Sequence, residues 1–354
     1  MQSSDHPASR KKIILIWWAL GLFYTLTSHA STSDLAYRMP ISYNPNPVAG
    51  RLYLQPIDTH EDQCVTGFEG EIVYGEASEY NIYFVAEEKD PRMTVNTRML
   101  SLKASYGGHF MGYGIETGTL LRVHRDERDT LLSNMLKNYH EFMGFGNIPE
   151  EGAYFGGIGN NYSTVIGKSG EIFLTTLQMY AKIQILEDGG EGTRTPNLSI
   201  KSTVRAPLSG NRFDTGGGAL SLGMSKQIRR NISLIGAVGL VFQDIDPADF
   251  EAENLHVEKW AEDALMGIVW DMGKEEGWYI STAMRRSSER VAYKGNPESA
   301  GNAYCVHLLL AYRQPMAHGI PMEFFINVNE DIPDFGHGLE PDFCVQTGVS
   351  VRVF

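Results

Sequence analysis

The sequence predicts an all-β fold, a transmembrane antiparallel up-and-down β-barrel of about twelve strands. Three observations lead to this expectation. Segment after segment alternates apolar and polar residues with period two, as a strand with one apolar and one polar face does. Many of these segments are long enough to cross a membrane as tilted strands. The links between them are alternately short and long, as in barrels with short turns at one end and larger loops at the other.

Residues 1–30 have the pattern of a secretory signal peptide. A basic run over 10–12 is followed by an apolar stretch over 13–26, and small residues stand at Ser28 and Ala30. We expect cleavage after Ala30 and export of the remainder. A retained membrane helix is the alternative, but the apolar stretch is shorter than the roughly 20 residues that span a bilayer.

The composition excludes some partners and cofactors. The formal net charge is −13 and becomes about −15 without residues 1–30, which carry Arg10, Lys11, Lys12 and Asp5. We therefore expect no nucleic-acid partner, because the chain has no net positive field to attract phosphates. The three cysteines are too few and too scattered for a disulfide framework or a Cys-rich metal site, and we expect no cofactor.

Two regions follow the signal peptide. Residues 31–79 have Pro and Asn punctuation and only fragments of strand pattern, so we expect an N-terminal periplasmic extension or a partial plug. Residues 80–354 are expected to form the barrel. The expected strands are 80–88, 93–106, 113–123, 171–186, 196–207, 217–228, 232–242, 259–272, 277–288, 303–313, 322–330 and 342–353.

The links form two sets. The short set, expected on the periplasmic side, comprises 107–112, 187–195, 229–231, 273–276 and 314–321. The long set, expected outside the cell, comprises 89–92, 124–170, 208–216, 243–258, 289–302 and 331–341. A soluble secreted sandwich, the alternative all-β reading, has no reason to sort its links in this way.

The alternation also predicts which side chains line the lumen. In the strand 113–123, for example, Tyr113, Ile115 and Leu121 share one face, opposite Glu116 and Arg122. The candidate lumen-lining residues are Glu116, Arg122, Lys182, Lys201, Arg205, Asp263, Asp271, Arg285, His307 and Arg313. Because cations and anions are mixed, they could ring a narrow aqueous path or pair into a closed plug.

Aromatic residues near strand ends are candidates for interfacial girdles, although strands are rich in aromatics in any case. They are Tyr113, Trp260, Trp270, Trp278, Tyr279, Tyr304 and Tyr312.

The link 124–170 is the most unusual segment, because structureless links of such length are uncommon and are generally functional or disordered. Asp129 or Thr130 could begin a helix that Gly144 and Gly146 end. Its apolar or neighbouring residues, the candidate loop or plug, are Leu132, Met135, Leu136, Tyr139, His140 and Met143. The helix could constrict the lumen, cap its mouth, lie on the membrane or simply pack on the rim.

His124, Asp126, His140 and Glu141 could supply a metal or acid–base site next to this helix. However, no His pair has the i,i+4 spacing of a strong metal motif, and no nucleophile-elbow motif occurs. We therefore expect neither a metal site nor an enzyme.

Short motifs are distributed over most of the chain after residue 30. They are NPNP at 44–47, NTRMLSL at 96–102, GFGNIPE at 144–150 and PDF at 341–343. In these the chain resembles the bacterial family called domain of unknown function 3187, presumed outer-membrane barrels. The resemblance implies a location and an architecture, and it assigns no catalytic residue.

We therefore expect a protein of the cell outer membrane, in contact with its lipids and lipopolysaccharide and inserted by the outer-membrane assembly machinery. The leading hypothesis is a small-bore channel or a structural barrel of unknown substrate. The alternatives are an outer-membrane enzyme acting on lipid or lipopolysaccharide, and a surface adhesin or receptor.

Overall fold

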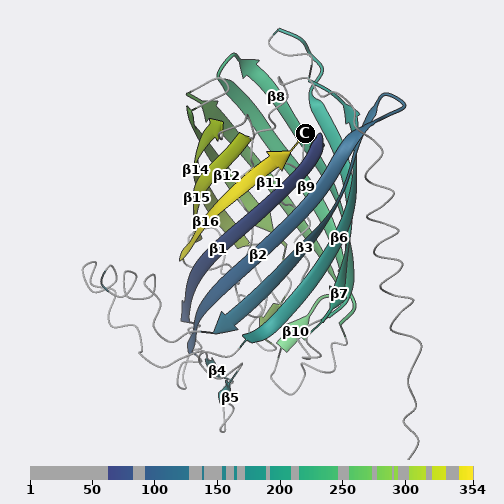
Figure 1. The fold of residues 1–354 in the computed structure, drawn as a ribbon. Coiled ribbons are helices and arrows are strands. Elements are labelled where there is room, and N and C mark those ends of the chain that lie inside the picture. Colours follow the sequence, from purple (N-terminus) through teal and green to yellow (C-terminus); the bar gives the residue numbers. More distant parts are fainter. Residues whose placement is uncertain are drawn as a thin grey trace, which may run out of the picture.

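The computed structural model is a closed barrel of twelve antiparallel strands, and the predicted fold class is confirmed (Figure 1). The structure describes residues 63–82, 92–126, 138, 154–156, 163–165, 172–188, 192–208, 215–245, 255–272, 277–288, 291–293, 303–315, 321–331 and 343–353. The barrel strands are β1 (Gly67–Ile82), β2 (Arg92–Phe110), β3 (Tyr113–Asp126), β6 (Ile172–Leu186), β7 (Asn197–Pro207), β8 (Gly217–Arg229), β9 (Ile232–Gln243), β11 (Trp260–Asp271), β12 (Gly277–Ser287), β14 (Ala303–Pro315), β15 (Pro321–Asp331) and β16 (Phe343–Val353).

Strands that follow one another in this series pair with one another, and β1 closes the ring against β16. In the closing pairs, Ile72 of β1 stands opposite Leu102 of β2 on one side and Val349 of β16 on the other. Closure leaves no sheet edge with unpaired backbone groups, which is the condition for strands to cross hydrocarbon.

The two ends of the barrel differ. At the short-turn end, Met111 and Gly112 form a two-residue hairpin turn, both with positive φ (51° and 86°), the backbone that matches the twist of the flanking strands. At the opposite, long-loop end, the links contain two small sheets, β4 (Tyr154–Gly156) with β5 (Ser163–Val165) and β10 (Leu255–Val257) with β13 (Val291–Tyr293), toward the bottom of Figure 1. The predicted asymmetry of the links is therefore present.

The first predicted strand is wrong. The structure places β1 at Gly67–Ile82 rather than at 80–88, so the barrel begins inside the segment assigned to an N-terminal extension. The alternation is weak there because Gly70 interrupts the outward-facing apolar side chains. The inward face carries two acidic residues, Glu69 and Glu71, both buried. The other expected strands correspond to β2 and the barrel strands that follow it.

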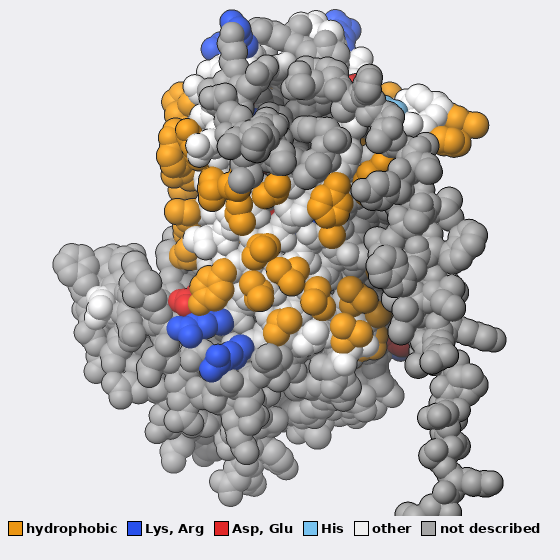
Figure 2. Space-filling view, in the orientation of Figure 1, with side chains coloured by type: hydrophobic (Ala, Val, Ile, Leu, Met, Phe, Trp, Pro, Cys, Tyr) orange, Lys and Arg blue, Asp and Glu red, His pale blue; other side chains and the backbone are white. Residues whose placement is uncertain are grey.

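The outer wall of the barrel is apolar. Figure 2 shows hydrophobic side chains spread over the side of the barrel, with basic side chains nearer its two ends. Large residues on this face are substantially exposed, for example Ile72 (51%) and Leu222 (39%). Such a closed, apolar outer wall is suited to hydrocarbon and not to water.

Aromatic residues occur on the outer face near both ends. Trp270 and Trp278 flank the link between β11 and β12, at the short-turn end, and are each 49% exposed. At the long-loop end, the rings of Trp260 and Phe242 lie 5.0 Å apart. Tyr279, one of the predicted girdle residues, is fully buried in the interior instead, because its neighbour Trp278 takes the outward position.

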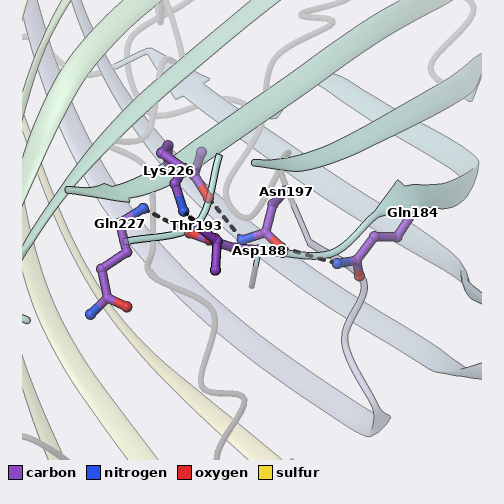
Figure 3. Close-up of polar contacts among 7 residues, drawn as sticks. Gln184, Asp188, Thr193, Asn197, Lys226 and Gln227 are labelled. Atoms are coloured by element: carbon purple, nitrogen blue, oxygen red, sulfur yellow. Dashed lines mark hydrogen bonds and ion pairs between the residues drawn. The ribbon is translucent and has the colours of Figure 1, made fainter. Parts of the chain in front are cut away.

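A network of hydrogen bonds and one ion pair fixes the link between β6 and β7 to the end of β8 (Figure 3). The Asp188 carboxylate pairs with the Lys226 ammonium and accepts a hydrogen bond from the Gln227 backbone N–H at 2.7 Å. The Asp188 N–H donates to Asn197 Oδ1 at 2.8 Å, and Gln184 Nε2 donates to the same oxygen at 3.3 Å. These bonds hold the longest of the short links against the barrel.

Within the described ranges, no helix is both long enough and apolar enough to cross a membrane. Of the helix expected between 131 and 143, the structure describes residue 138 alone. The candidate plug residues lie outside the described residues; they are Leu132, Met135, Leu136, Tyr139, His140 and Met143.

Candidate functional site in the barrel interior

The ten candidate lumen-lining residues all have buried side chains in the structure, with exposed fractions from 1% to 9%. They alternate along their strands with exposed apolar residues, as the period-two pattern predicts. In β7, for instance, Lys201 and Arg205 are buried, whereas Ile200 and Val204 are 39% and 53% exposed. The interior is therefore polar and densely filled at these residues, and it is not a wide water-filled tube there.

Glu116 is the centre of a cluster near the short-turn end. Its carboxylate accepts a hydrogen bond from Tyr180 Oη at 2.6 Å and pairs with Lys182 Nζ at 2.8 Å. The backbone N–H of Val65 donates to its second oxygen at 2.7 Å. Three donors thus converge on one buried charge, an arrangement that satisfies a carboxylate away from bulk water.

Tyr180 joins this cluster to two further cations. Lys103 Nζ and Lys201 Nζ each lie 5.7 Å from the centroid of its ring, within the range of cation–π attraction. The ring packs over Gly118, where a Cβ would come within 2.5 Å of it. The sequence analysis gave neither Tyr180 nor Lys103 a role.

The segment immediately before β1 lies against the inner wall at the short-turn end. Cys64 donates its N–H to Gln184 Oε1 at 3.1 Å. A Cβ on Gly107 would lie 1.8 Å from the Val65 carbonyl oxygen, and one on Gly114 would lie 3.2 Å from Cys64 Cβ. Both glycines leave room for residues 63–66, which narrow the interior at this end.

A second charged cluster links β11, β12, β14 and β15. Arg313 pairs with Glu323 at 3.4 Å and with Asp271 at 3.6 Å. Its guanidinium lies 4.4 Å from the centroid of the Tyr279 ring. The Arg313 guanidinium thus pairs with two carboxylates, and the Tyr279 ring lies against it inside the barrel.

A third cluster lies toward the long-loop end, where Asp263 accepts hydrogen bonds from Arg285 Nη2 at 3.0 Å and Ser287 Oγ at 2.7 Å. On β14 and β15, His307 Nδ1 is 2.6 Å from Asn329 Oδ1, and Asn327 Nδ2 donates to the same oxygen at 2.7 Å. These groups form buried polar pairs inside the barrel.

Part of the interior is apolar. A buried cluster runs over β1, β2, β9, β11, β12, β14 and β15. Its members are Val73, Met99, Ile235, Ala237, Leu265, Val269, Tyr279, Ala283, Leu309, Ala311 and Phe325. The polar and charged side chains on β3, β6 and β7 therefore form a separate stretch of the inner wall, which sequence alternation alone did not distinguish.

The residues considered for metal or acid–base chemistry are not brought together in the described part of the chain. His124 is buried, 2% exposed, near the long-loop end of β3, whereas His140 and Glu141 lie outside the described residues. Within the described residues, no group of three His, Cys, Asp or Glu side chains could hold a metal ion.

The fold defines the class: a closed twelve-stranded barrel with an apolar outer wall, as in outer-membrane β-barrels. No protein-family model matches the chain, and no curated protein matches it in sequence. Among solved structures, it is similar to an outer membrane channel from Pseudomonas putida F1, with a TM-score of 0.54 and 10% identity over 85% of this chain and 100% of that one. This likeness shows a common fold.

Two further barrels are similar at lower scores. The KdgM porin has a TM-score of 0.36 at 7% identity, covering 80% of this chain and 99% of that chain. The toluene transporter TodX of Pseudomonas putida has a TM-score of 0.38 at 8% identity, covering 92% of this chain and 100% of that chain.

Proposed function

We propose that this protein is a small-bore channel of the outer membrane, not an enzyme. The observation that best supports this proposal is the contrast between the outer and the inner face of the closed barrel. The outer wall carries exposed apolar side chains that are suited to contact with lipid and lipopolysaccharide, whereas β3, β6 and β7 carry a polar and charged inner wall. A structural barrel has no need to bury this many charges, because apolar residues would fill its interior at lower cost.

Because side chains fill much of the interior, we propose that the path through the barrel is narrow and that it opens and closes. At twelve strands, a barrel is intermediate between the side-chain-filled eight-stranded kind and the open 16–18-stranded porin. Residues 63–66 narrow the interior at the short-turn end, where Glu116 and Gln184 hold them. We propose that the long link between β3 and β6 acts as the gate at the other end.

The test is single-channel conductance in a planar bilayer. The chain is expressed with its own amino-terminal segment, purified from outer membranes and compared with a variant lacking 127–153. We expect small, steady conductance steps that increase in the deletion variant, with heat-modifiable migration confirming that both barrels are folded.

Folded barrels without conductance in either form would contradict the channel proposal. Recovery of the chain from a fraction other than the outer membrane would contradict the location. Conductance that is unchanged by the deletion would leave the channel but refute the gate.

A further inference from the structure

The buried charges are not evenly distributed around the barrel. Four cations on β3, β6 and β7 form what we call the basic wall: Arg122, Lys182, Lys201 and Arg205, each 2% to 7% exposed. The only buried carboxylate on the described parts of these three strands is Glu116. The basic wall therefore keeps an excess of positive charge after its own counter-ion is counted.

Elsewhere in the described interior, buried carboxylates outnumber buried Lys and Arg side chains by five to three. On β11, β12, β14 and β15, Arg285 and Arg313 pair directly with three carboxylates. The described parts of β8 and β9 bury no charged side chain in the interior. On the other flank, Lys103 of β2 stands directly opposite Glu71 of β1, and β1 also buries Glu69. The positive excess is therefore local to β3, β6 and β7.

The register brings the cations of the basic wall together. Lys182 and Lys201 are directly opposite each other across the β6–β7 pair, a placement of like charges that costs stability. Arg205 stands opposite Gln178, and Arg122 stands opposite Thr176, two positions away along β6. These side chains make contacts within the barrel. The summed charge of the basic wall and Glu116 is nevertheless positive, and this sign is what matters for a passing ion.

From this distribution we infer that the basic wall selects small anions, namely solutes that carry carboxylate or phosphate groups. Low-dielectric walls focus the field of the cations into the bore and raise the local concentration of anions. Arginine and lysine supply hydrogen-bond donors that match carboxylate and phosphate oxygens. The inference rests on the proposed channel function and gives it a substrate class.

The experiment measures the reversal potential of the full chain in a KCl gradient across a planar bilayer. We expect chloride to be more permeant than potassium in the wild type. The permeability ratio should fall several-fold in Arg205→Gln and fall further, below one, in the double variant Lys201→Glu/Arg205→Glu. The matched control is Arg98→Gln, because Arg98 is 32% exposed on the outer face and pairs with Glu76 at 3.0 Å; its ratio should equal that of the wild type.

A second readout does not require conductance. The temperature of heat-modifiable migration is measured with inorganic phosphate and with acetate, at constant ionic strength. Both anions should raise it in the wild type and Arg98→Gln, and by less in the milder double variant Lys201→Gln/Arg205→Gln, which also serves if charge reversal prevents folding.

The outcomes are distinguishable. Conductance without anion preference, or with a preference that Arg205→Gln does not lower, overturns the inference and leaves the channel standing. Folded barrels that do not conduct contradict the proposed channel. The temperature of heat-modifiable migration then decides whether the basic wall binds anions. No stabilisation by either anion, or equal stabilisation in the wild type and Lys201→Gln/Arg205→Gln, overturns that binding.

Discussion

Replacing Glu116 with glutamine should destabilise the barrel strongly, because it breaks one of the fully buried ion pairs of the described interior. The substitution keeps the size of the side chain but removes the charge that Lys182 Nζ approaches at 2.8 Å and that Tyr180 Oη and the Val65 N–H also contact. The Lys182 and Glu116 side chains are 2% and 0% exposed, so water cannot easily replace the lost partner.

The magnitude follows from this burial. Breaking a buried ion pair by removing one partner costs about 3–5 kcal/mol, because the other charge stays buried without compensation. We therefore expect a loss of about 3 kcal/mol. The assay is equilibrium unfolding by urea in lipid vesicles, followed by tryptophan fluorescence.

Two comparisons make this prediction falsifiable. Glu323→Gln should cost only about 1 kcal/mol, because Arg313 retains Asp271 as a second carboxylate. In a double-mutant cycle, Glu116→Gln with Lys182→Met should cost less than the sum of the single changes, since the orphaned ammonium is then absent. A loss below about 1 kcal/mol for Glu116→Gln, or simple additivity in the cycle, would refute the reasoning.

Two other predictions concern the two faces of the wall. Leu222→Arg places a cation on the outer face of β8, and we expect a loss of about 2–4 kcal/mol in the same unfolding assay; an unchanged stability would mean that this face does not contact hydrocarbon. Gly107→Ala puts a methyl group 1.8 Å from the Val65 carbonyl oxygen, so segment 63–66 must move and a maleimide should label Cys64 faster than in the wild type. Equal labelling rates would show that the segment does not depend on this close approach.

The position of the first strand shows where sequence reasoning fails. Residues 80–88 contain a conspicuous run of aromatic and apolar residues, whereas Gly67–Ile82 has its outward apolar residues separated by Gly70. Pairing with β2 and β16 on both sides supplies what the local pattern lacks. Backbone hydrogen bonds to two neighbours stabilise a strand whose own alternation is faint.

The candidate site was only partly accessible from the sequence. Alternation grouped Glu116, Lys182, Lys201 and Arg205 with the polar faces of their strands, and all four side chains are buried in the structure, because the side chains of a strand point alternately to its two sides. It could not show that Glu116 receives the Val65 N–H, since the two residues lie 51 positions apart. The predicted gate residues between 132 and 143 remain a prediction.

The sequence by itself determined the class of fold, the sidedness of most strands and the distinction between the two ends. These properties follow from period-two alternation and link length, which are local. The tertiary structure alone decided closure, register and the grouping of charges, such as the hydrogen bond from Ser350 to Glu69 across 281 positions. The physical reason is that register depends on pairing between strands, and a shift of two residues preserves every face while changing every charged neighbour.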